Sequence, residues 1–427
     1  MTWYFLIPFI FLILAFILRI PIGFGMFMGT IAYFLAKGMD IGIMVNTVGY
    51  SLFSSYILIA IPLFVFTANV MNSSEVTDKI FKFANSLVGR YPGGTGYVNI
   101  LASLLFAGMT GSALADATGL GMLEIEQMTR EGYDKPFSCA ITAASAVIGP
   151  IFPPSIPFVI YAMISGASVG KLFMGGVLPA IIIGIVLAIY IYFVSKKRNY
   201  PRGVRRTFKQ FIFDTIRALP ALFTPVILLI GIYTGVMTPT EAGAIAGLYT
   251  LLISFVVYRT LSWKVLWRNI KDTVRTTGSV FLVIAAAFGF NYIANVEQVA
   301  PIVANMLSSF TGSPLVFLLI VNIVFLILGA FVDVAVSQLV FVPIIMPLVH
   351  YFNIDLTHFG VMICLNMMIG LLTPPFGMLL FVTAGVGKIS LKDMIRETLP
   401  MVGVLFIALA IITIFPQTVL FLPSFMK

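Results

Sequence analysis

The chain has 427 residues, of which 60% are hydrophobic and only 10% are charged, and its mean hydropathy is +1.07. This composition excludes a soluble globular domain, in which about 25% of residues are charged. Apolar windows of about 20 residues recur along almost the whole chain and lack the ten-residue alternation of a membrane β-barrel. The sequence therefore predicts an all-α polytopic membrane protein with roughly ten to twelve membrane segments.

The chain opens on an apolar segment that we expect to be a membrane helix and not a cleaved signal peptide. Trp3 and Tyr4 are residue types typical of a membrane interface. Residues 1–20 contain neither a basic start nor a small-residue cleavage site.

Residues 95–130 are predicted to form a re-entrant hairpin. An apolar stretch of about twelve residues runs into a cluster of small and polar residues, Gly108 to Ser112, before a helical pattern returns. Twelve residues are too few to span a bilayer, and re-entrant hairpins have tips of this kind. Asp116 lies just beyond the tip, where a carboxylate is a candidate functional group. The alternative is a helix N-cap, or a hydrogen bond that pins the hairpin.

Residues 137–166 are predicted to form a discontinuous helix, which the sequence GPIFPPS interrupts. Proline lacks an N–H and its ring displaces the carbonyl four residues earlier, so Pro153 frees the carbonyl of Gly149 and Pro154 frees that of Pro150. Freed carbonyls at membrane depth favour a hard cation such as sodium, or a water that carries a proton. The alternative is a kinked helix whose carbonyls bond to nearby hydroxyls or water.

Residues 201–217 are predicted to be a cytoplasmic basic linker. Residues 196–209 hold seven basic side chains and no acidic one, and short loops rich in Lys and Arg remain in the cytoplasm. The net charge of +9 is therefore expected to face lipid headgroups of the bilayer and not nucleic acid. Further along, residues 262–275 combine basic residues with two tryptophans, which predicts an amphipathic arm helix at the interface.

The linker separates two halves, residues 1–200 and 218–427, that repeat the same motifs. A Gly-x-x-x-Pro-Pro motif recurs in register with a second glycine, which indicates an internal duplication. The matches share one spacing of 221 positions and are Gly149 with Gly370, Pro153 with Pro374, and Gly108 with Gly329. The spacing alone leaves open whether the two repeats are parallel or inverted.

The duplication predicts a second hairpin over residues 314–347 and a second discontinuous helix over residues 357–386. In the second hairpin, Asp333 takes the place of Ser112, and Ser337 takes the place of Asp116. The second break frees two further carbonyls by the same rule. The pairs are Pro374 with Gly370 and Pro375 with Leu371.

A secondary transporter fits these motifs better than the alternatives. The histidines, His350 and His358, lack the spacing of a zinc or nucleophile site and are interpreted as interface residues. The segment SGASVGKLF lacks the spacing of an ATP-binding loop, and a channel would need a continuous polar path. Hairpin tips that meet broken helices near the midplane are typical of transporter binding sites. Glu241 is predicted to cap the helix that follows it.

The motifs GMTGSALAD, GPIFPPS and GLLTPPFG resemble those of the large membrane subunit of the tripartite ATP-independent periplasmic (TRAP) transporters, and the resemblance covers essentially the whole chain. It implies two inverted repeats, in which hairpins and discontinuous helices move as an elevator against a scaffold. It also implies a multi-pass protein of the bacterial inner membrane that is not an enzyme. A stand-alone ion-coupled anion transporter or channel of the same superfamily stays open as an alternative.

The resemblance further implies import of an organic acid, such as a C4-dicarboxylate or sialic acid, driven by a sodium gradient and without another cofactor. Two partners are expected. One is a small four-helix membrane subunit, here a separate chain, and the other is a periplasmic substrate-binding protein.

The resemblance also implies roles for individual residues. One sodium ion lies between the first tip and the first break, the other lies between the second tip and the second break, and the organic acid lies between the tips. The sodium-binding residues are Gly108, Gly149, Phe152, Ser155, Gly329, Gly370, Thr373 and Phe376. The substrate-binding residues are Thr110, Gly111 and Ser112, and the residues that shape the hairpins and breaks are Asp116, Pro153, Pro154, Asp333, Ser337, Pro374 and Pro375. Phe376 replaces Ser155 in the second half, so the two ion sites need not match.

Overall fold

The computed structural model describes residues 3–74, 76–203, 207–310 and 312–426. Within these ranges the regular elements are helices, and one isolated β-bridge joins Pro92 to Arg202. Eight helices are long and apolar enough to cross a membrane, by length and composition, and six shorter apolar helices accompany them. The all-α membrane fold is thus confirmed. The predicted ten to twelve spans exceed the eight long helices because several apolar segments are interrupted.

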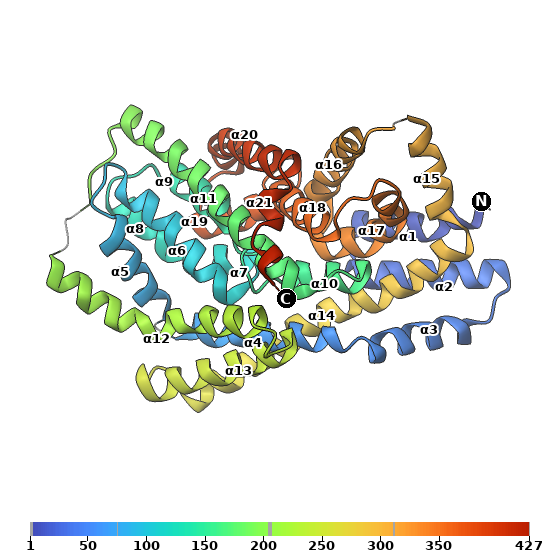
Figure 1. The fold of residues 1–427 in the computed structure, drawn as a ribbon, viewed down its shortest axis with the longest axis horizontal. Coiled ribbons are helices and arrows are strands. Elements are labelled where there is room, and N and C mark those ends of the chain that lie inside the picture. Colours follow the sequence, from blue (N-terminus) through green and yellow to red (C-terminus); the bar gives the residue numbers. More distant parts are fainter. Residues whose placement is uncertain (1–2, 75, 204–206, 311, 427) are drawn as a thin grey trace.

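The two halves contain the same kinds of element in the same order (Figure 1). The helices of the first half are α1 (Leu6–Ile17), α2 (Ile22–Lys37), α3 (Ile41–Ser54), α4 (Ala60–Ser73), α5 (Val76–Val88), α6 (Gly94–Thr110), α7 (Ala113–Thr118), α8 (Leu120–Arg130), α9 (Lys135–Ala146), α10 (Ile156–Ser165) and α11 (Val169–Arg198). Those of the second half are α12 (Phe208–Tyr233), α13 (Pro239–Leu252), α14 (Trp263–Val296), α15 (Val299–Phe310), α16 (Pro314–Phe331), α17 (Val334–Tyr351), α18 (Leu356–Gly370), α19 (Met378–Gly387), α20 (Leu391–Ile414) and the short α21 (Gln417–Leu420).

Helices of one half pack on helices of the other half in a reciprocal pattern. The second part of each discontinuous helix contacts the opposite hairpin, because α10 packs on α17 while α19 packs on α7 and α8. The first parts behave alike, since α9 packs on α20 and α18 packs on α11. The pattern extends to the outer helices, where α2 packs on α14 and α13 packs on α4. Two copies related by a two-fold exchange produce such pairs, which supports the duplication read from the sequence.

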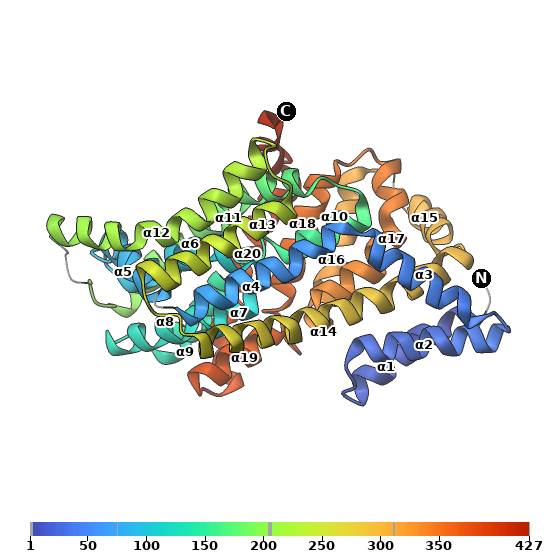
Figure 2. The same ribbon diagram turned by 90° about the horizontal axis from the view of Figure 1, so that it is seen from below.

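The outer helices form a layer along one face of the molecule. Figure 2 shows α12, α13, α4 and α14 lying across this face, with the hairpins and discontinuous helices behind them. The layer is held together by contacts of α4 with both α13 and α14, and of α12 with α5 and α13. The site elements therefore lie against a framework that is built largely from different helices.

Several helices begin or end at other residues than the sequence predicted. α12 begins at Phe208, within the predicted 201–217 linker, because Thr207 and Gln210 form a capping box. Residues 204–206 of that linker lie outside the described residues. α14 runs for 34 residues, so the predicted arm helix at 262–275 is the first part of a longer helix. The first helix of each hairpin is longer than the twelve residues expected. α6 has 17 residues because it already begins at Gly94, and α16 has 18 residues and begins at Pro314.

His358 corrects one interpretation. Its side chain is 2% exposed within α18, and its Nε2 lies 2.8 Å from the carbonyl oxygen of Ile412 on α20. The interface interpretation is therefore wrong for His358, which instead ties the second discontinuous helix to α20. His350 is exposed at the end of α17.

Candidate substrate and ion site

The tip of the first hairpin is a tight turn that presses on the first break. α6 ends at Thr110, and Gly111 follows in the left-handed region with φ +61°. Ser112 then caps α7, because its hydroxyl accepts from the N–H of Ala115 at 3.4 Å. A Cβ at Gly111 would lie 2.3 Å from the carbonyl oxygen of Pro154. Only glycine fits both this φ and this approach.

The two acidic residues of the tips have different roles. Asp333 caps α17, since its carboxylate accepts from the N–H of Ala335 at 2.9 Å, so it is the structural counterpart of Ser112. Asp116 lies one turn inside α7 and is 2% exposed. Its Oδ1 accepts a hydrogen bond from the Thr110 hydroxyl. Asp333 is thus a helix cap, and Asp116 makes a hydrogen bond across the first tip, which are the two forms of the structural alternative.

The first break is a buried irregular segment between α9 and α10. α9 ends at Ala146, before the glycine and the prolines, and the chain becomes helical again at Ile156. Ser155 caps α10 by accepting from the N–H of Phe158 at 3.2 Å, and its hydroxyl donates to the carbonyl of Pro150. The freed Pro150 carbonyl therefore already accepts one hydrogen bond.

The second break is more exposed than the first, and each of its two freed carbonyls accepts a backbone hydrogen bond. The Gly370 carbonyl accepts from the N–H of Thr373 at 2.9 Å, and the Leu371 carbonyl accepts from the N–H of Leu379 at 3.1 Å. The side chain of Phe376 is 47% exposed. The proline rule alone predicted carbonyls without a hydrogen-bond partner, whereas these carbonyls each accept one hydrogen bond. A carbonyl oxygen has two lone pairs and can still bind an ion.

Each hairpin tip touches the break of its own half. In the second half, a Cβ at Gly370 would lie 2.6 Å from the carbonyl carbon of Gly329. In the first half, a Cβ at Gly108 would lie 3.3 Å from Cε1 of Phe152. The structure therefore places Gly329 against Gly370 and Gly108 against Phe152, residue pairs to which the resemblance assigned ion binding.

A cavity of about 220 Å³ lies between the two tips. Thr110 does not line it, because its hydroxyl is turned toward Asp116. Among the described residues that line the cavity none is basic, and Asp333 is the acidic one. The lining residues are Gly111, Ser112, Ala113 and Leu114 of the first hairpin, Asp333, Val334 and Ala335 of the second, Pro150, Ile156, Pro157 and Ile160 around the first break, Met368 and Leu371 at the second, and Thr276 and Val280 of α14.

A buried polar network behind the first hairpin was missed by sequence reasoning. Asn99 of α6 donates to the Thr142 hydroxyl at 2.7 Å and accepts from the Ser145 hydroxyl at 2.7 Å, both on α9. Ser103 donates to Ser145 at 2.9 Å. Glu124 of α8 is 1% exposed and lies beside the hydroxyls of Thr142 and Ser103. The available signal was the polar residues three and four apart within apolar helices.

A second buried carboxylate, that of Asp116, lies against the first break. A Cβ at Gly149 would lie 2.2 Å from Oδ2 of Asp116, so this oxygen lies directly against the break. Within the described part of the chain, Oδ2 of Asp116 and Oε1 of Glu124 have no hydrogen-bond partner. A buried carboxylate oxygen without a partner is costly. The arrangement is thus well suited to a cation at the first break.

We expect Asn99→Leu to lower the free energy of unfolding by about 2–4 kcal/mol, because it removes one buried hydrogen bond from the Thr142 hydroxyl and one from the Ser145 hydroxyl. The exposed Asn46 on α3 provides the matched control, and Asn46→Leu should change stability by less than about 0.5 kcal/mol. Thermal unfolding of the purified full chain in detergent compares the two variants. Equal melting temperatures for both would contradict a structural role for the network.

Comparison with known proteins shows the family of the chain. Residues 9–418 match the family described as the tripartite ATP-independent periplasmic transporter, DctM component. The chain is 42% identical, over 95% of both chains, to the sialic acid TRAP transporter large permease protein SiaM of Vibrio cholerae. It is also 42% identical to the sialic acid TRAP transporter permease protein SiaT of Haemophilus influenzae, over 97% of this chain and 67% of that protein.

The chain is also similar to a relative named for another substrate and to a transporter of known structure. The chain is 36% identical to the C4-dicarboxylate TRAP transporter large permease protein DctM of Pseudomonas aeruginosa, over 87% of both chains. In fold it resembles the YdaH transporter of Alcanivorax borkumensis, with a TM-score of 0.63 and 12% identity over 88% of this chain and 87% of that one. The relatives are transporters and not enzymes, and the eight apolar helices fit a multi-pass protein of the bacterial inner membrane. The chain belongs to the DctM family, the large permease component of the tripartite ATP-independent periplasmic transporters.

Proposed function

We propose that the chain is the translocating subunit of a sodium-coupled symporter that imports an organic acid. The observation that carries this proposal is the cavity between the hairpin tips, which contains Asp333 and no basic side chain among its described lining residues. A carboxylate substrate placed beside Asp333 would be repelled unless cations entered with it. Sodium ions at the two neighbouring breaks would provide that positive charge.

The two sodium ions are proposed to bind where each tip meets its break. Hard cations prefer oxygen ligands, and the carbonyls freed by the prolines retain lone pairs for an ion. Asp116 would add a carboxylate to the first site, and Asp333 lies beside the second. The proposed residues are Gly108, Gly149, Phe152 and Ser155 for the first ion, and Gly329, Gly370, Thr373 and Phe376 for the second.

The substrate is proposed to lie between the tips, against Gly111 and Ser112. Thr110 would act indirectly, because its hydroxyl bonds to Asp116. Both relatives at 42% identity are named for sialic acid, whereas relatives named for C4-dicarboxylate or 2,3-diketo-L-gulonate are at 36% and 33%. We therefore propose sialic acid as the first substrate to test.

The composition of the cavity lining supports a proposed movement of the hairpins relative to α14. Its volume of about 220 Å³ is below the roughly 300–1,000 Å³ that encloses a drug-sized ligand. Thr276 and Val280 of α14 close one side, and the hairpins and breaks form the others. Sliding the hairpins and discontinuous helices as one unit against α14 would open the cavity. This is the elevator mechanism, with α4, α12, α13 and α14 as the framework.

Two partners belong to the proposal. A periplasmic substrate-binding protein would deliver the acid, and a small membrane subunit would associate with the framework helices. The support is membership in a tripartite family and the name of SiaM as a large permease, which implies a smaller one.

Thr373→Val tests the sodium coupling. The Thr373 hydroxyl donates to the carbonyl of Ile369 at 2.9 Å and lies at the second break. Its loss should raise the sodium concentration for half-maximal uptake by about tenfold, since an oxygen ligand at an ion site contributes on the order of 1–2 kcal/mol. The measurement is sialic acid uptake into proteoliposomes that contain the chain, its small subunit and the loaded binding protein.

Thr383→Val is the matched control. The Thr383 hydroxyl makes the same kind of bond, to the carbonyl of Leu379 at 2.7 Å, but it lies inside α19 and outside the cavity lining. It should leave the sodium dependence unchanged. Uptake by the wild type that is indifferent to sodium would refute the symport proposal, whereas equal effects of both variants would refute the role of the second break.

A further inference from the structure

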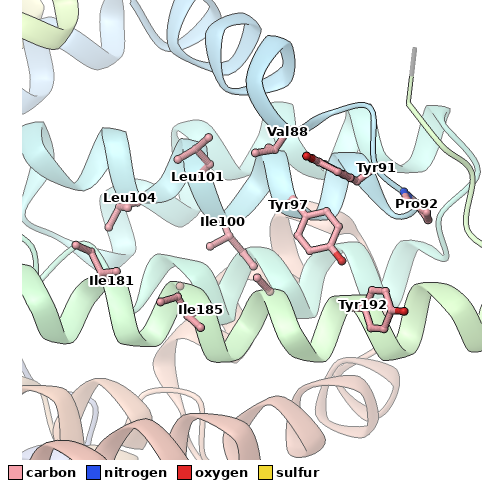
Figure 3. Close-up of a pocket in the computed structure, with 12 residues that line it drawn as sticks. Val88, Tyr91, Pro92, Tyr97, Ile100, Leu101, Leu104, Ile181, Ile185 and Tyr192 are labelled. Carbon is pink, nitrogen blue, oxygen red and sulfur yellow. The ribbon is translucent and has the colours of Figure 1, made fainter. Parts of the chain in front are cut away.

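An apolar groove of about 470 Å³ lies between α5, α6 and α11, away from the cavity between the tips. Figure 3 shows its two long walls. Ile100, Leu101 and Leu104 lie along α6, and Ile181 and Ile185 lie along α11. The side chains of Ile181 and Ile185 are exposed, at 38% and 53%. The groove is long and narrow, as an acyl chain requires.

One end of the groove carries phenol side chains, and the other end is purely aliphatic. Tyr91, Tyr97 and Tyr192 gather at the first end, while Leu104 and Ile181 lie at the second (Figure 3). Tyrosines are enriched at the depth of the lipid headgroups, where the ring is in apolar surroundings and the hydroxyl in polar ones. This end of the groove therefore corresponds to the headgroup level.

Basic side chains stand just beyond the phenols. Arg90 places its guanidinium over the ring of Tyr91, at 5.1 Å, and donates to the Tyr91 hydroxyl at 3.1 Å. Lys196 follows Tyr192 by one helical turn, on the same stripe of α11, and is exposed. The β-bridge between Pro92 and Arg202 holds a third cation at this end.

Acidic residues near this end are already engaged by other groups. Glu131 accepts from Thr95 and Gln127, and Asp134 accepts from Arg198 and Tyr200. The positive charge at the mouth of the groove therefore remains available to a ligand. The sequence places this end on the cytoplasmic side, because it adjoins the basic loop.

We propose that this groove is a binding site for an anionic phospholipid of the cytoplasmic leaflet. One acyl chain would lie between α6 and α11, and the headgroup phosphate would face Arg90, Lys196 and Arg202. Basic residues at the membrane surface attract anionic lipid by about 1 kcal/mol each. Because Val88, Tyr91 and Pro92 come from the end of α5 and its loop, the lipid would bridge α5 to α6 and α11.

The second half provides an internal control. A groove of about 230 Å³ lies between α16 and α20, the counterparts of α6 and α11. Its described lining contains no charged residue and no tyrosine. It has the apolar walls without the phenols and cations, so it should accept acyl chains without a preference for the headgroup. The residues are Leu315, Leu319, Asn322, Phe406, Leu409, Ala410, Thr413 and Ile414.

The experiment is photo-crosslinking of the full chain in nanodiscs that contain phosphatidylglycerol or phosphatidylcholine with a photoreactive acyl chain. Mass spectrometry of peptides locates the adducts. For the wild type we expect adducts on α6 and α11 to be about tenfold more frequent with phosphatidylglycerol than with phosphatidylcholine. For the α16 and α20 groove we expect equal frequencies with the two lipids.

Two variants separate the headgroup from the acyl chain. The double change Arg90→Gln with Lys196→Gln should remove the headgroup preference and leave the adducts in place. Gly184→Phe should remove the adducts with both lipids, because a Cβ at Gly184 meets only Cγ2 of Ile100, at 3.5 Å, and the ring then fills the groove. Ala188→Leu serves the same purpose if Gly184→Phe does not fold.

Three results would overturn the proposal. The first is equal adduct frequencies for the two lipids in the α6 and α11 groove of the wild type. The second is adducts that persist unchanged in the groove-filling variants. The third is a groove that loses all adducts when the small membrane subunit is present, which would identify it as a protein interface.

Discussion

Gly370→Ala is expected to abolish uptake, reducing its rate by at least about a hundredfold, and to lower the free energy of unfolding by about 1–3 kcal/mol. The Cβ added at Gly370 would lie 2.6 Å from the carbonyl carbon and 2.7 Å from Cα of Gly329. Both neighbours are backbone atoms, so the second tip and the second break must separate. The carbonyls proposed to hold the second sodium ion then lose their arrangement. Proteoliposome uptake and thermal unfolding measure the two effects.

Gly385→Ala is the matched control for this prediction. Gly385 lies in α19, on the other side of the same break, and a Cβ placed there meets no atom within 4 Å. Alanine has the higher helix propensity, so this variant should be at least as stable as the wild type and up to about 1 kcal/mol more stable. It should also transport normally. Normal uptake by Gly370→Ala would show that contact between tip and break is dispensable.

The placement of the site was largely predictable, because it depends on backbone chemistry that particular residue types impose. Proline removes a hydrogen bond wherever it stands in a helix, and glycine permits close approach, so repeated motifs around Gly149 and Gly370 locate both breaks. The single spacing of 221 positions then locates both tips, at Gly108 and Gly329. In the structure each tip contacts the break of its own half.

The side-chain networks were not predictable, because they depend on how separate helices rotate against one another. Glu124 lies in a stretch with several charged residues, which is the pattern of a surface helix, yet it is buried between α6 and α9. His358 lies close to the start of α18, where an exposed side chain is expected, yet its ring contacts the carbonyl of Ile412 on α20. The Gly370 carbonyl accepts from Thr373, just before the prolines, and the Leu371 carbonyl accepts from Leu379, beyond them. The geometry of both hydrogen bonds follows only from the folded break.

The exchange of acidic and hydroxyl residues between the halves gives the two proposed ion sites different surroundings. Asp116 places a carboxylate oxygen directly against the first break, whereas its counterpart Ser337 is neutral and fully buried. Asp333 instead caps the second tip and lines the cavity. The first break is buried at Ser155, and the second is exposed at Phe376. A sodium ion at the first site should therefore depend most strongly on a carboxylate.

Asp116→Asn is accordingly expected to weaken the dependence of stability on sodium. In sodium-free buffer the wild type contains a buried carboxylate with one oxygen lacking a partner, and the neutral amide avoids the burial of a negative charge. The variant should therefore be about 1–3 kcal/mol more stable than the wild type without sodium. In the wild type, saturating sodium should add about 2–3 kcal/mol per occupied site. In the variant the sodium-dependent gain should fall by about half, because one of the two sites is lost.

Asp40→Asn distinguishes this effect from a general loss of charge. The Asp40 carboxylate caps α3 by accepting from the N–H of Gly42 at 2.8 Å, and asparagine caps a helix equally well. This control should keep the wild-type response to sodium. Thermal unfolding of the full chain over a range of sodium concentrations, at constant ionic strength with choline, measures all three proteins. If Asp116→Asn kept the full sodium-dependent gain, Asp116 would not contribute to the ion site. If it were less stable than the wild type without sodium, the buried carboxylate would carry no net cost, and the proposed need for a cation beside Asp116 would be refuted.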